Sequence, residues 1–398
     1  MIDEEIPFPP NSGKRIRTFN LFKYLAKKHE IVWISRQLEG VQSSRTDFEA
    51  LGIRTQVLGE PVRRKSGLQF YISLLANLLS PNPYVVSSHF SKEMSRAIRD
   101  ICLREPFDLV HCEWTPYAAN MQGLGPLPTV CSAHNVESMV WYRNQCIEKN
   151  PIKKLYIGLQ ARKMERFERQ TLPAFTRVIS VSDRDRHIIS TWVASDHIAV
   201  IPNGVDIDYF RRDCNPEVPK SLVFVGSLDW RPNIDCVLYF LDEIWPLVKS
   251  AVPESSFSIV GRNPHHSLRI RAEREPSVNI YASVQDVRPF VNSATVCVVP
   301  LRIGSGSRLK ILEAFAMEKA VVSTSIGAEG LEVEHGRHLL IADSPADFAG
   351  AVAKLLSDAE RRRQLSVEGR ELVERQYAWP ALAAQLESEW EKASCQHP

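Results

Sequence analysis

Short apolar runs rich in β-branched residues alternate with amphipathic stretches from about residue 30 onward. The runs are apolar on both faces, which is typical of strands buried in a parallel sheet. The amphipathic stretches have helical spacing, so the pattern predicts a parallel α/β fold. We expect strands at residues 30–35, 54–58, 107–112, 129–134 and 177–181 in the first half, and at 221–225, 257–260, 278–281, 295–299, 320–323 and 338–341 in the second.

Each half holds enough elements for one doubly wound unit, including a long helix expected at residues 138–171. Pro202 and the pair Asn203-Gly204 punctuate the chain between the halves. Two such domains facing across a cleft would bind ligand at the carboxyl ends of their strands. The expected division is a first domain at 1–200, a second at 201–377, and a C-terminal helix at 378–398 that packs back on the first domain.

The chain opens on Met1-Ile2-Asp3-Glu4-Glu5, where a doubly wound domain normally has a buried apolar strand. Burying these three carboxylates in a parallel sheet would carry a large desolvation cost. We therefore expect the chain as given to start one strand late: either its start is truncated, or the first domain is weakened and the loop at 9–13 is poorly anchored. The start also lacks the positive charge and apolar run of a signal peptide, so a cytoplasmic location is expected.

The composition excludes two classes of protein. The 49 Lys and Arg residues nearly balance 47 Asp and Glu residues, giving a net charge of +2, so the chain is not a dedicated nucleic-acid binder. Its 8 cysteines form no Cys-x-x-Cys pair, which argues against structural zinc and favours reduced thiols in a cytosolic protein.

Two segments leave contact with a membrane surface open. Residues 66–91 carry no Asp, Glu, Lys or Arg, and their apolar part, 68–79, is too short to cross a bilayer of about 30 Å. We interpret it as a buried helix, with an interfacial helix as the alternative. The early helix at 13–28 is strongly basic, so peripheral contact with anionic lipid on the inner face of the cell membrane is a second possibility.

The most informative stretch follows the expected strand at 295–299. Gly304-Ser305-Gly306-Ser307 leads into a helix that begins with Arg308 and Lys310. Glycines let the backbone approach an anion, and the helix N-terminus offers free N–H groups. Cations are disfavoured there unless an anion binds, so the segment predicts a diphosphate site. Glu313, one turn on, can accept hydrogen bonds from a ribose diol.

With these residues in view, the chain resembles the retaining glycosyltransferases of GT-B fold, specifically glycosyltransferase family 4, over nearly its whole length. The sequence of these segments most resembles a bacterial sugar-transferase subgroup associated with exopolysaccharide export. The resemblance rests on Pro7-Phe8-Pro9-Pro10-Asn11-Ser12-Gly13, His134-Asn135-Val136-Glu137, Val181-Ser182, Ile201-Pro202-Asn203-Gly204-Val205-Asp206, Phe224-Val225-Gly226-Ser227 and Leu309-Lys310-Ile311-Leu312-Glu313-Ala314.

The resemblance implies two Rossmann-like domains facing across a cleft. It also implies transfer of a sugar, with retention, from a nucleotide-diphosphate donor to a hydroxyl of a saccharide or lipid-linked saccharide, in exopolysaccharide or cell-surface glycan synthesis. No cofactor beyond the donor is implied. Two alternatives stay open: a nucleotide-sugar epimerase of GT-B fold, and a non-catalytic nucleotide-sugar-binding protein.

The family's site residues carry over by position. Lys310 and Arg308 would neutralise the diphosphate, and Glu313 would hold the ribose. His134 would orient the donor sugar or the acceptor hydroxyl, and Gly13 would lie in a loop that closes on the sugar phosphate. Backbone N–H groups for the leaving phosphate and sugar would come from Gly304, Ser305 and Gly306.

The chain departs from the family's pattern at two positions. Many relatives carry a glutamate where Ser305 stands, and often an arginine after Gly226, where this chain has Ser227. Arg231 is a candidate substitute for that arginine, with a surface role at a turn as the alternative.

Two Asp-x-Asp segments match the metal-binding pattern of another glycosyltransferase fold. They are Asp183-Arg184-Asp185 and Asp206-Ile207-Asp208. The first begins an expected helix and the second lies in the interdomain join. Because a basic diphosphate site is already present elsewhere, we expect structural roles for both and no metal requirement.

Overall fold

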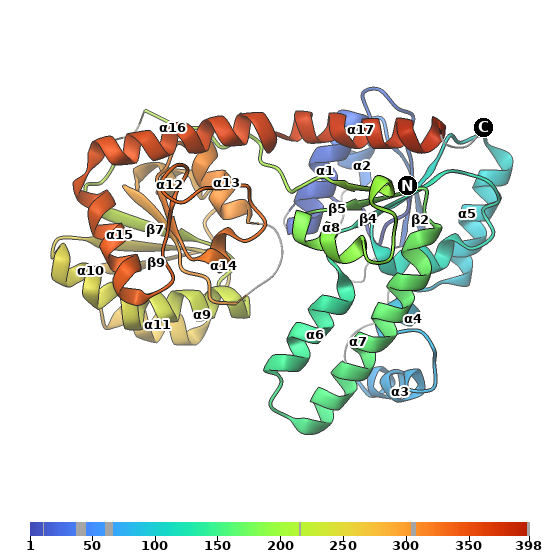
Figure 1. Cartoon of the computed structure of the whole chain (residues 1–398), viewed down its shortest axis with the longest axis horizontal. Coiled ribbons are helices and arrows are strands. Elements are labelled where there is room, and N and C mark those ends of the chain that lie inside the picture. The colour runs from blue at the N-terminus through green and yellow to red at the C-terminus, as the bar shows by residue number, and fades with distance from the viewer. Residues whose placement is uncertain (11, 37–44, 60–66, 215, 304–307, 396–398) are drawn as a thin grey trace. The chain divides into compact units, whose positions relative to one another are not determined.

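A computed structural model describes the chain except for residues 11, 37–44, 60–66, 215, 304–307 and 396–398. The chain divides into two compact units. The first comprises Met1–Pro202 with Leu382–Pro398, and the second comprises Asn203–Ala381. Both units are parallel α/β structures with helices packed around a sheet (Figure 1).

The sheet of the first unit is parallel throughout its described strands. β3, β4, β5 and β6 pair in that order, and β1 pairs with β2. Ile2 joins the two groups because it bridges β1 at Ile34 and β3 at Cys112. The strands are β1 (Val32–Arg36), β2 (Arg54–Leu58), β3 (Val110–Cys112), β4 (Thr129–Ala133), β5 (Arg177–Ser180) and β6 (Ile198–Val200).

The first residues therefore occupy the position of a central strand, and the prediction that Asp3 and its neighbours could not do so is wrong. The α-amino group of Met1 donates to the carbonyl of Val32 at 2.8 Å, and the N–H of Asp3 donates to the carbonyl of Ile34 at 3.1 Å. Asp3 is buried and forms an ion pair with Lys14. Burial raises the pKa of Asp3 to about 6 against the opposing charge of Lys14, which shows the desolvation cost that the sequence predicted.

The long helix predicted at 138–171 is two helices, α6 (Glu137–Ile147) and α7 (Pro151–Thr171). The side chain of Asn150 accepts hydrogen bonds from the first N–H groups of α7, and Pro151 occupies its first turn. Proline lacks an N–H and is tolerated there but not in a helix interior, so the chain must break before it.

The first unit also contains α1 (Gly13–Leu25), α2 (Arg45–Glu49), α3 (Leu68–Asn77), α4 (Tyr84–His89), α5 (Lys92–Arg104), α8 (Asp183–Ile189) and the 3₁₀ segments η1 (Thr115–Met121), η2 (Leu172–Ala174) and η3 (Ser195–His197).

One expectation about a surface segment is wrong. α3 is not a buried helix, because Tyr71, Leu75 and Leu79 are 63%, 66% and 93% exposed. The basic charge of the segment 13–28 is partly neutralised within the unit, and its contact with anionic lipid stays a prediction. Lys14 pairs with Asp3, Arg15 with Glu5 and Lys28 with Glu387, and Arg17 is buried.

The second unit is built on six parallel strands in the order β12-β11-β10-β7-β8-β9. The order reverses between β7 and β10, which makes the carboxyl ends of these two strands the topological switch point where ligands of such sheets bind. The strands are β7 (Ser221–Val225), β8 (Ser256–Gly261), β9 (Val278–Ala282), β10 (Val296–Val299), β11 (Val321–Ser323) and β12 (Leu340–Ile341).

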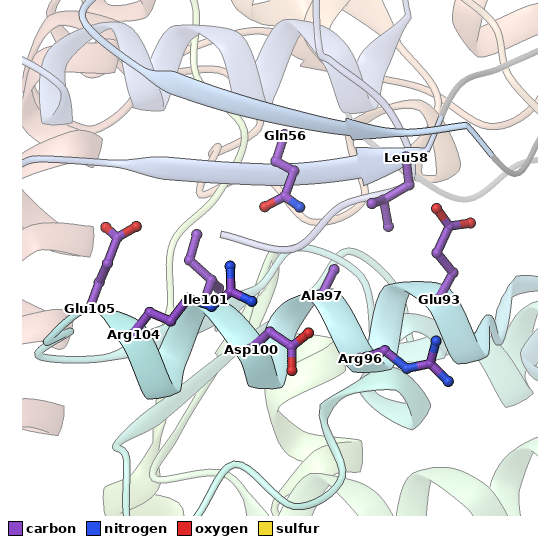
Figure 2. A pocket seen from close by; sticks show the side chains of 9 residues that line it. All are labelled: Gln56, Leu58, Glu93, Arg96, Ala97, Asp100, Ile101, Arg104 and Glu105. Atoms are coloured by element: carbon purple, nitrogen blue, oxygen red, sulfur yellow. The ribbon is translucent and has the colours of Figure 1, made fainter.

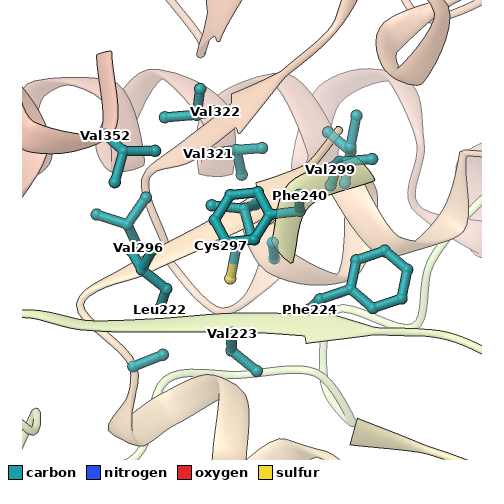
Figure 3. Packing of buried hydrophobic residues seen from close by; sticks show 14 of the residues in the cluster. Leu222, Val223, Phe224, Phe240, Val296, Cys297, Val299, Val321, Val322 and Val352 are labelled. Carbon is teal, nitrogen blue, oxygen red and sulfur yellow. The ribbon is translucent and has the colours of Figure 1, made fainter. Parts of the chain in front are cut away.

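The core of the second unit holds the switch-point strands in place. Val223, Phe224, Val296 and Val299 are buried, and Figure 3 shows them packed with Phe240 and neighbouring aliphatic residues. The helices are α9 (Arg231–Tyr239), α10 (Trp245–Ala251), α11 (His266–Glu273), α12 (Arg288–Ser293), α13 (Leu309–Ala316), α14 (Ser325–Ala328), α15 (Pro345–Ser357) and α16 (Ala359–Gln376), with a π-helical turn η4 (Phe240–Ile244).

The boundary between the units falls within the last helix, α17 (Trp379–Cys395). Leu382, Leu386 and Trp390 are buried in the first unit. Glu389 on the same helix accepts a 2.8 Å hydrogen bond from Nε of Arg177 on β5. The predicted apolar stripe of α17 is therefore covered, and a buried ion pair lies beside it.

Candidate active site

Lys310, Asn233 and Gly226 meet at the carboxyl edge of the second sheet. Gly226 follows β7, Asn233 lies on α9, and Lys310 lies in the first turn of α13 after β10. Nζ of Lys310 donates to Oδ1 of Asn233 at 2.9 Å, and Nδ2 of Asn233 donates to the carbonyl of Ser227 at 2.9 Å. A β-carbon at Gly226 would lie 2.8 Å from Nδ2 of Asn233 and 3.3 Å from Nζ of Lys310, so glycine is what allows the pair to form.

The ammonium group of Lys310 is desolvated and has a neutral hydrogen-bond partner. Nζ lies 4.4 Å from the centroid of the Phe224 ring. Within the described residues no carboxylate lies at ion-pair distance from it. Burial lowers the pKa of Lys310 to about 8. A cation in this state gains free energy when an anion binds beside it.

Glu313 lies one turn after Lys310 and lines the same small apolar pocket, with Val225, Val299 and Phe210 among the other lining residues. Burial raises the pKa of Glu313 to about 7, with the charge of Lys310 opposing the shift. The structure thus brings together two residues that the sequence assigned to the diphosphate and the ribose.

Arg308 is also in this region, but its charge already has a partner. It is buried, and its guanidinium approaches the carboxylate and the carbonyl oxygen of Glu329, each at 3.3 Å. Arg308 therefore differs from Lys310 in that an internal carboxylate compensates it. The predicted phosphate-binding residues Gly304, Ser305 and Gly306 lie outside the described residues.

The two candidate arginines near Ser227 differ in their surroundings. Arg231 is exposed at the first position of α9. Arg262 follows Gly261 at the end of β8, and its Nε donates to Oγ of Ser227 at 3.0 Å. The sequence analysis missed Arg262 and Asn233. The sequence held one signal for Arg262, which is the glycine before it at the end of a strand. Gly261 is needed there because a β-carbon would collide with the carbonyl of Gly226.

In the first unit, His134 follows β4 and is partly exposed, as predicted for a residue at a strand end. Its Nε2 lies 3.3 Å from Oε1 of Glu113, a buried carboxylate directly after β3. Glu137, the first residue of α6, accepts a 2.8 Å hydrogen bond from Nε1 of Trp114. The sequence analysis missed Glu113.

Gly13 begins α1 in the first unit. The hydroxyl of Ser12 caps that helix by accepting the N–H of Arg15 at 3.4 Å. Gly13 is therefore the first residue of the helix and not a loop residue, and its place near the sugar phosphate stays a prediction.

The two Asp-x-Asp segments make local contacts. Asp206 accepts the backbone N–H groups of Asp208 and Tyr209 at 3.1 and 2.9 Å. Asp183 lies 3.6 Å from Arg186, and the backbone N–H of Asp185 is capped by Ser182. Across the residues that the structure describes, no group of three or more His, Cys, Asp or Glu side chains is arranged to hold a metal ion.

A second pocket lies between β2 and α5 in the first unit (Figure 2). Charged side chains of α5, among them Glu93, Arg96 and Asp100, line it with Gln56 and Leu58. It contains none of the site residues that the sequence predicts, so it is not the candidate active site.

Two family profiles match the chain. The profile "Glycosyltransferase Family 4" matches residues 12–209, and the profile "Glycosyl transferases group 1" matches residues 219–358. The chain is a family 4 glycosyltransferase. This family is retaining and metal-independent, and its members use nucleotide sugars.

Curated relatives of this glycosyltransferase include an "Uncharacterized 44.6 kDa protein in cps region" of Klebsiella pneumoniae, 22% identical over 95% of both chains. A GDP-mannose-dependent alpha-(1-6)-phosphatidylinositol monomannoside mannosyltransferase of Mycobacterium tuberculosis is 28% identical over 208 residues. That match spans 47% of this chain and 54% of the mycobacterial enzyme.

Solved structures show the same fold. Anabaena HepE in complex with UDP and glucose superposes with a TM-score of 0.67 at 12% identity, covering 98% of each chain. Sucrose-phosphate synthase of Thermosynechococcus elongatus gives 0.71 at 17% identity, covering 99% of this chain and 98% of its own. The glycosyltransferase therefore has the GT-B fold of two Rossmann-like domains.

Proposed function

We propose that this glycosyltransferase moves a sugar from a nucleotide-diphosphate donor to a hydroxyl of a saccharide or lipid-linked saccharide, in exopolysaccharide or cell-surface glycan synthesis. The observation that carries the proposal is the desolvated ammonium of Lys310, which has a neutral partner at the switch point of the second sheet. The full-length match to a protein of a cps region supports the exopolysaccharide role.

The donor diphosphate is the group that this site suits. As the bond from the anomeric carbon to the phosphate oxygen breaks, negative charge develops on the diphosphate and positive charge on the sugar. Lys310, Arg262 and the N-terminus of α13 stabilise the departing diphosphate. Arg262 takes this role in preference to Arg231 because Ser227, a neutral residue, holds its guanidinium beside Gly226. Arg308 adds positive charge near the same helix start, where it pairs with the carboxylate of Glu329.

The remaining roles follow from position. Glu313 accepts the ribose hydroxyls, and the role of Gly304, Ser305 and Gly306 at the leaving phosphate, outside the described residues, stays a prediction from the family resemblance. In the first unit, His134 orients a sugar hydroxyl, and Gly13, at the start of α1, lies near the sugar phosphate. The acceptor oxygen attacks the anomeric carbon on the face from which the diphosphate departs, and its proton passes to a phosphate oxygen, so configuration is retained without a carboxylate base.

The donor can be identified by thermal stabilisation. We expect one of a panel of UDP-, GDP- and ADP-sugars to raise the melting temperature of the wild-type protein and to have little effect on K310A. Failure of every nucleotide sugar to stabilise the protein contradicts the proposal. With the stabilising donor, epimerisation of the sugar without an acceptor supports an epimerase, and binding without turnover on any hydroxyl acceptor supports a non-catalytic binder.

Peripheral contact with an anionic membrane is the second part of the proposal. In the part of the chain that the structure describes, no helix is long and apolar enough to cross a bilayer. The exposed residues Leu75 and Leu79 of the α3 segment offer apolar side chains to an interface. α7, whose Lys163 donates to the carbonyl of Asn77 at the end of α3, adds exposed Lys153 and Lys154. Apolar side chains beside cations match the chemistry of an anionic lipid surface.

Sedimentation with vesicles tests this contact. We expect wild-type protein to bind vesicles of phosphatidylcholine with phosphatidylglycerol more strongly than vesicles of phosphatidylcholine alone. The L75S/L79S variant should lose this binding, whereas L103S, which changes a leucine that is 85% exposed at the end of α5, should keep it. Equal binding by both variants contradicts a contact through α3.

A further inference from the structure

One buried carboxylate connects three elements of the first unit. Glu113 is 1% exposed, and its Oε1 accepts a 2.9 Å hydrogen bond from Oγ1 of Thr18 on α1. Nε2 of His111 on β3 and Nε2 of His134 after β4 each lie 3.3 Å from its oxygens. Burying a carboxylate is costly unless such partners compensate it, so this cluster is a built feature of the fold.

Glu113 is ionised. Burial raises its pKa, but His111 and His134, whose Nε2 atoms each lie 3.3 Å from one of its oxygens, outweigh that effect and hold the pKa well below its usual value. A carboxylate accepts hydrogen bonds and cannot donate them. Nε2 of His134 is 3.3 Å from Oε1 without hydrogen-bond geometry, and the negative charge of the carboxylate favours a proton on that nitrogen.

The last helix fixes the state of His111. Nε1–H of Trp390 on α17 donates to Nδ1 of His111 at 2.8 Å, so Nδ1 carries no proton. Nε2 of His111 lies 2.8 Å from Oγ of Ser132 as well as near Glu113. Burial lowers the pKa of His111, which keeps the ring neutral with its proton on Nε2. The chain of contacts thus runs from α17 through His111 and Glu113 to His134.

We infer that Glu113 is a positioning residue for His134, and that Trp390 of α17 supports it through His111. Glu113 holds Nε2–H of His134, which fixes the ring and leaves Nδ1 as an acceptor for a hydroxyl of the sugar substrate. The inference rests on the proposed role of His134 in orienting such a hydroxyl. It gives α17 a function beyond covering apolar surface, because its indole N–H sets the tautomer of the neighbouring imidazole.

A double-mutant cycle separates positioning from folding. E113Q keeps the size of the side chain and an acceptor for Thr18, but offers His134 a neutral amide. We expect E113Q to lower kcat about 100-fold, the scale of a misplaced catalytic contact, with little change in donor KM. In an H134A background the same change should cost almost nothing more. An equal loss of kcat in both backgrounds overturns the inference.

Imidazole ¹⁵N chemical shifts test the pairing without any turnover. In wild-type protein we expect His134 to be protonated at Nε2, with H134A giving the assignment, and E113Q to change that resonance. Protonation of His134 at Nδ1 alone overturns the inference. If no nucleotide sugar is ever turned over, the proposed function fails, but these spectra still decide whether Glu113 positions His134.

W390F tests the contribution of α17. It keeps an aromatic ring but removes the N–H that His111 accepts. The matched control is W192F, because the buried indole N–H of Trp192 has no hydrogen-bond partner among the described residues. We expect W390F to shift the His111 resonances and lower kcat several-fold, and W192F to do neither. Identical effects of the two variants contradict a role for Trp390 in the chain of contacts that leads to His134.

Discussion

The amide oxygen of Asn233 accepts a 2.9 Å hydrogen bond from the ammonium group of Lys310, across the end of the strand that leads into Gly226. A neutral acceptor satisfies one donor of the ammonium group and brings no negative charge to it. The relationship explains why this edge of the second sheet suits a diphosphate, and most of the predictions below follow from it.

Replacing Lys310 by alanine should remove charge stabilisation from the departing diphosphate. We expect turnover to fall about 10²- to 10³-fold, the scale of one preorganised electrostatic contact. Steady-state kinetics with the stabilising donor measure this. K354A changes a lysine on α15 away from the site and should be neutral. Near-normal turnover in K310A would remove Lys310 from the site.

Arg262 should also stabilise the negative charge of the departing diphosphate. R262A is expected to lower kcat with the natural donor by about tenfold or more, with partial rescue in R262K because lysine keeps the charge but not the fork of donors. Arg269, exposed on α11, provides the matched control R269A. If R262A and R269A behave alike while R231A is inactive, the guanidinium comes from Arg231 instead.

Donor affinity should depend on the protonation of Lys310. Its pKa of about 8 is lowered by burial, and a bound diphosphate favours the ammonium form, so binding takes up a proton between pH 8 and 9. Affinity should therefore fall by up to about tenfold per pH unit above pH 8 and vary little through this group below pH 7. Calorimetry in buffers of different ionisation enthalpy measures the uptake. K310M should abolish it, whereas E313Q, which removes the neighbouring group with a pKa of about 7, should retain it.

The stability of α17 against local opening should depend on its buried ion pair. Arg177 and Glu389 are both 6% exposed, and removing one partner of such a pair leaves an uncompensated charge that costs about 3–5 kcal/mol. Hydrogen exchange of α17 amides should accelerate in E389A. E391A, at an exposed position of the same helix, should leave exchange unchanged. Equal exchange in the two variants would show that the ion pair does not hold α17.

The local pattern of apolar residues was sufficient to predict the strands of the second sheet and most of those of the first. The strands of the second sheet were all predictable from apolar runs because buried parallel strands need no help from distant residues. The short strand β6 (Ile198–Val200) was missed, since three residues carry too little pattern. The break before α7 was visible in Asn150-Pro151 but was outweighed by the helical spacing on either side.

Contacts between residues far apart in the chain could not be predicted from the sequence. Lys310 and Glu313 were found because they share a helix start, whereas Asn233 lies 77 positions from Lys310, and Trp390 lies 279 positions from His111. Glu113 follows a buried strand and carries no motif, so nothing local distinguishes it from a surface carboxylate. The exposure of α3 was likewise hidden, because an apolar segment has the same composition whether protein covers it or not.

We expect the second unit to bind a nucleoside diphosphate through its terminal phosphate at Lys310. Isothermal titration of the wild-type protein and K310A with the nucleoside diphosphate of the stabilising donor, and with the matching monophosphate, tests it most directly. Wild-type protein should bind the diphosphate at least about tenfold more tightly than the monophosphate, and K310A should bind the two nearly equally. Equal affinities in the wild-type protein, or an unchanged preference in K310A, would contradict it.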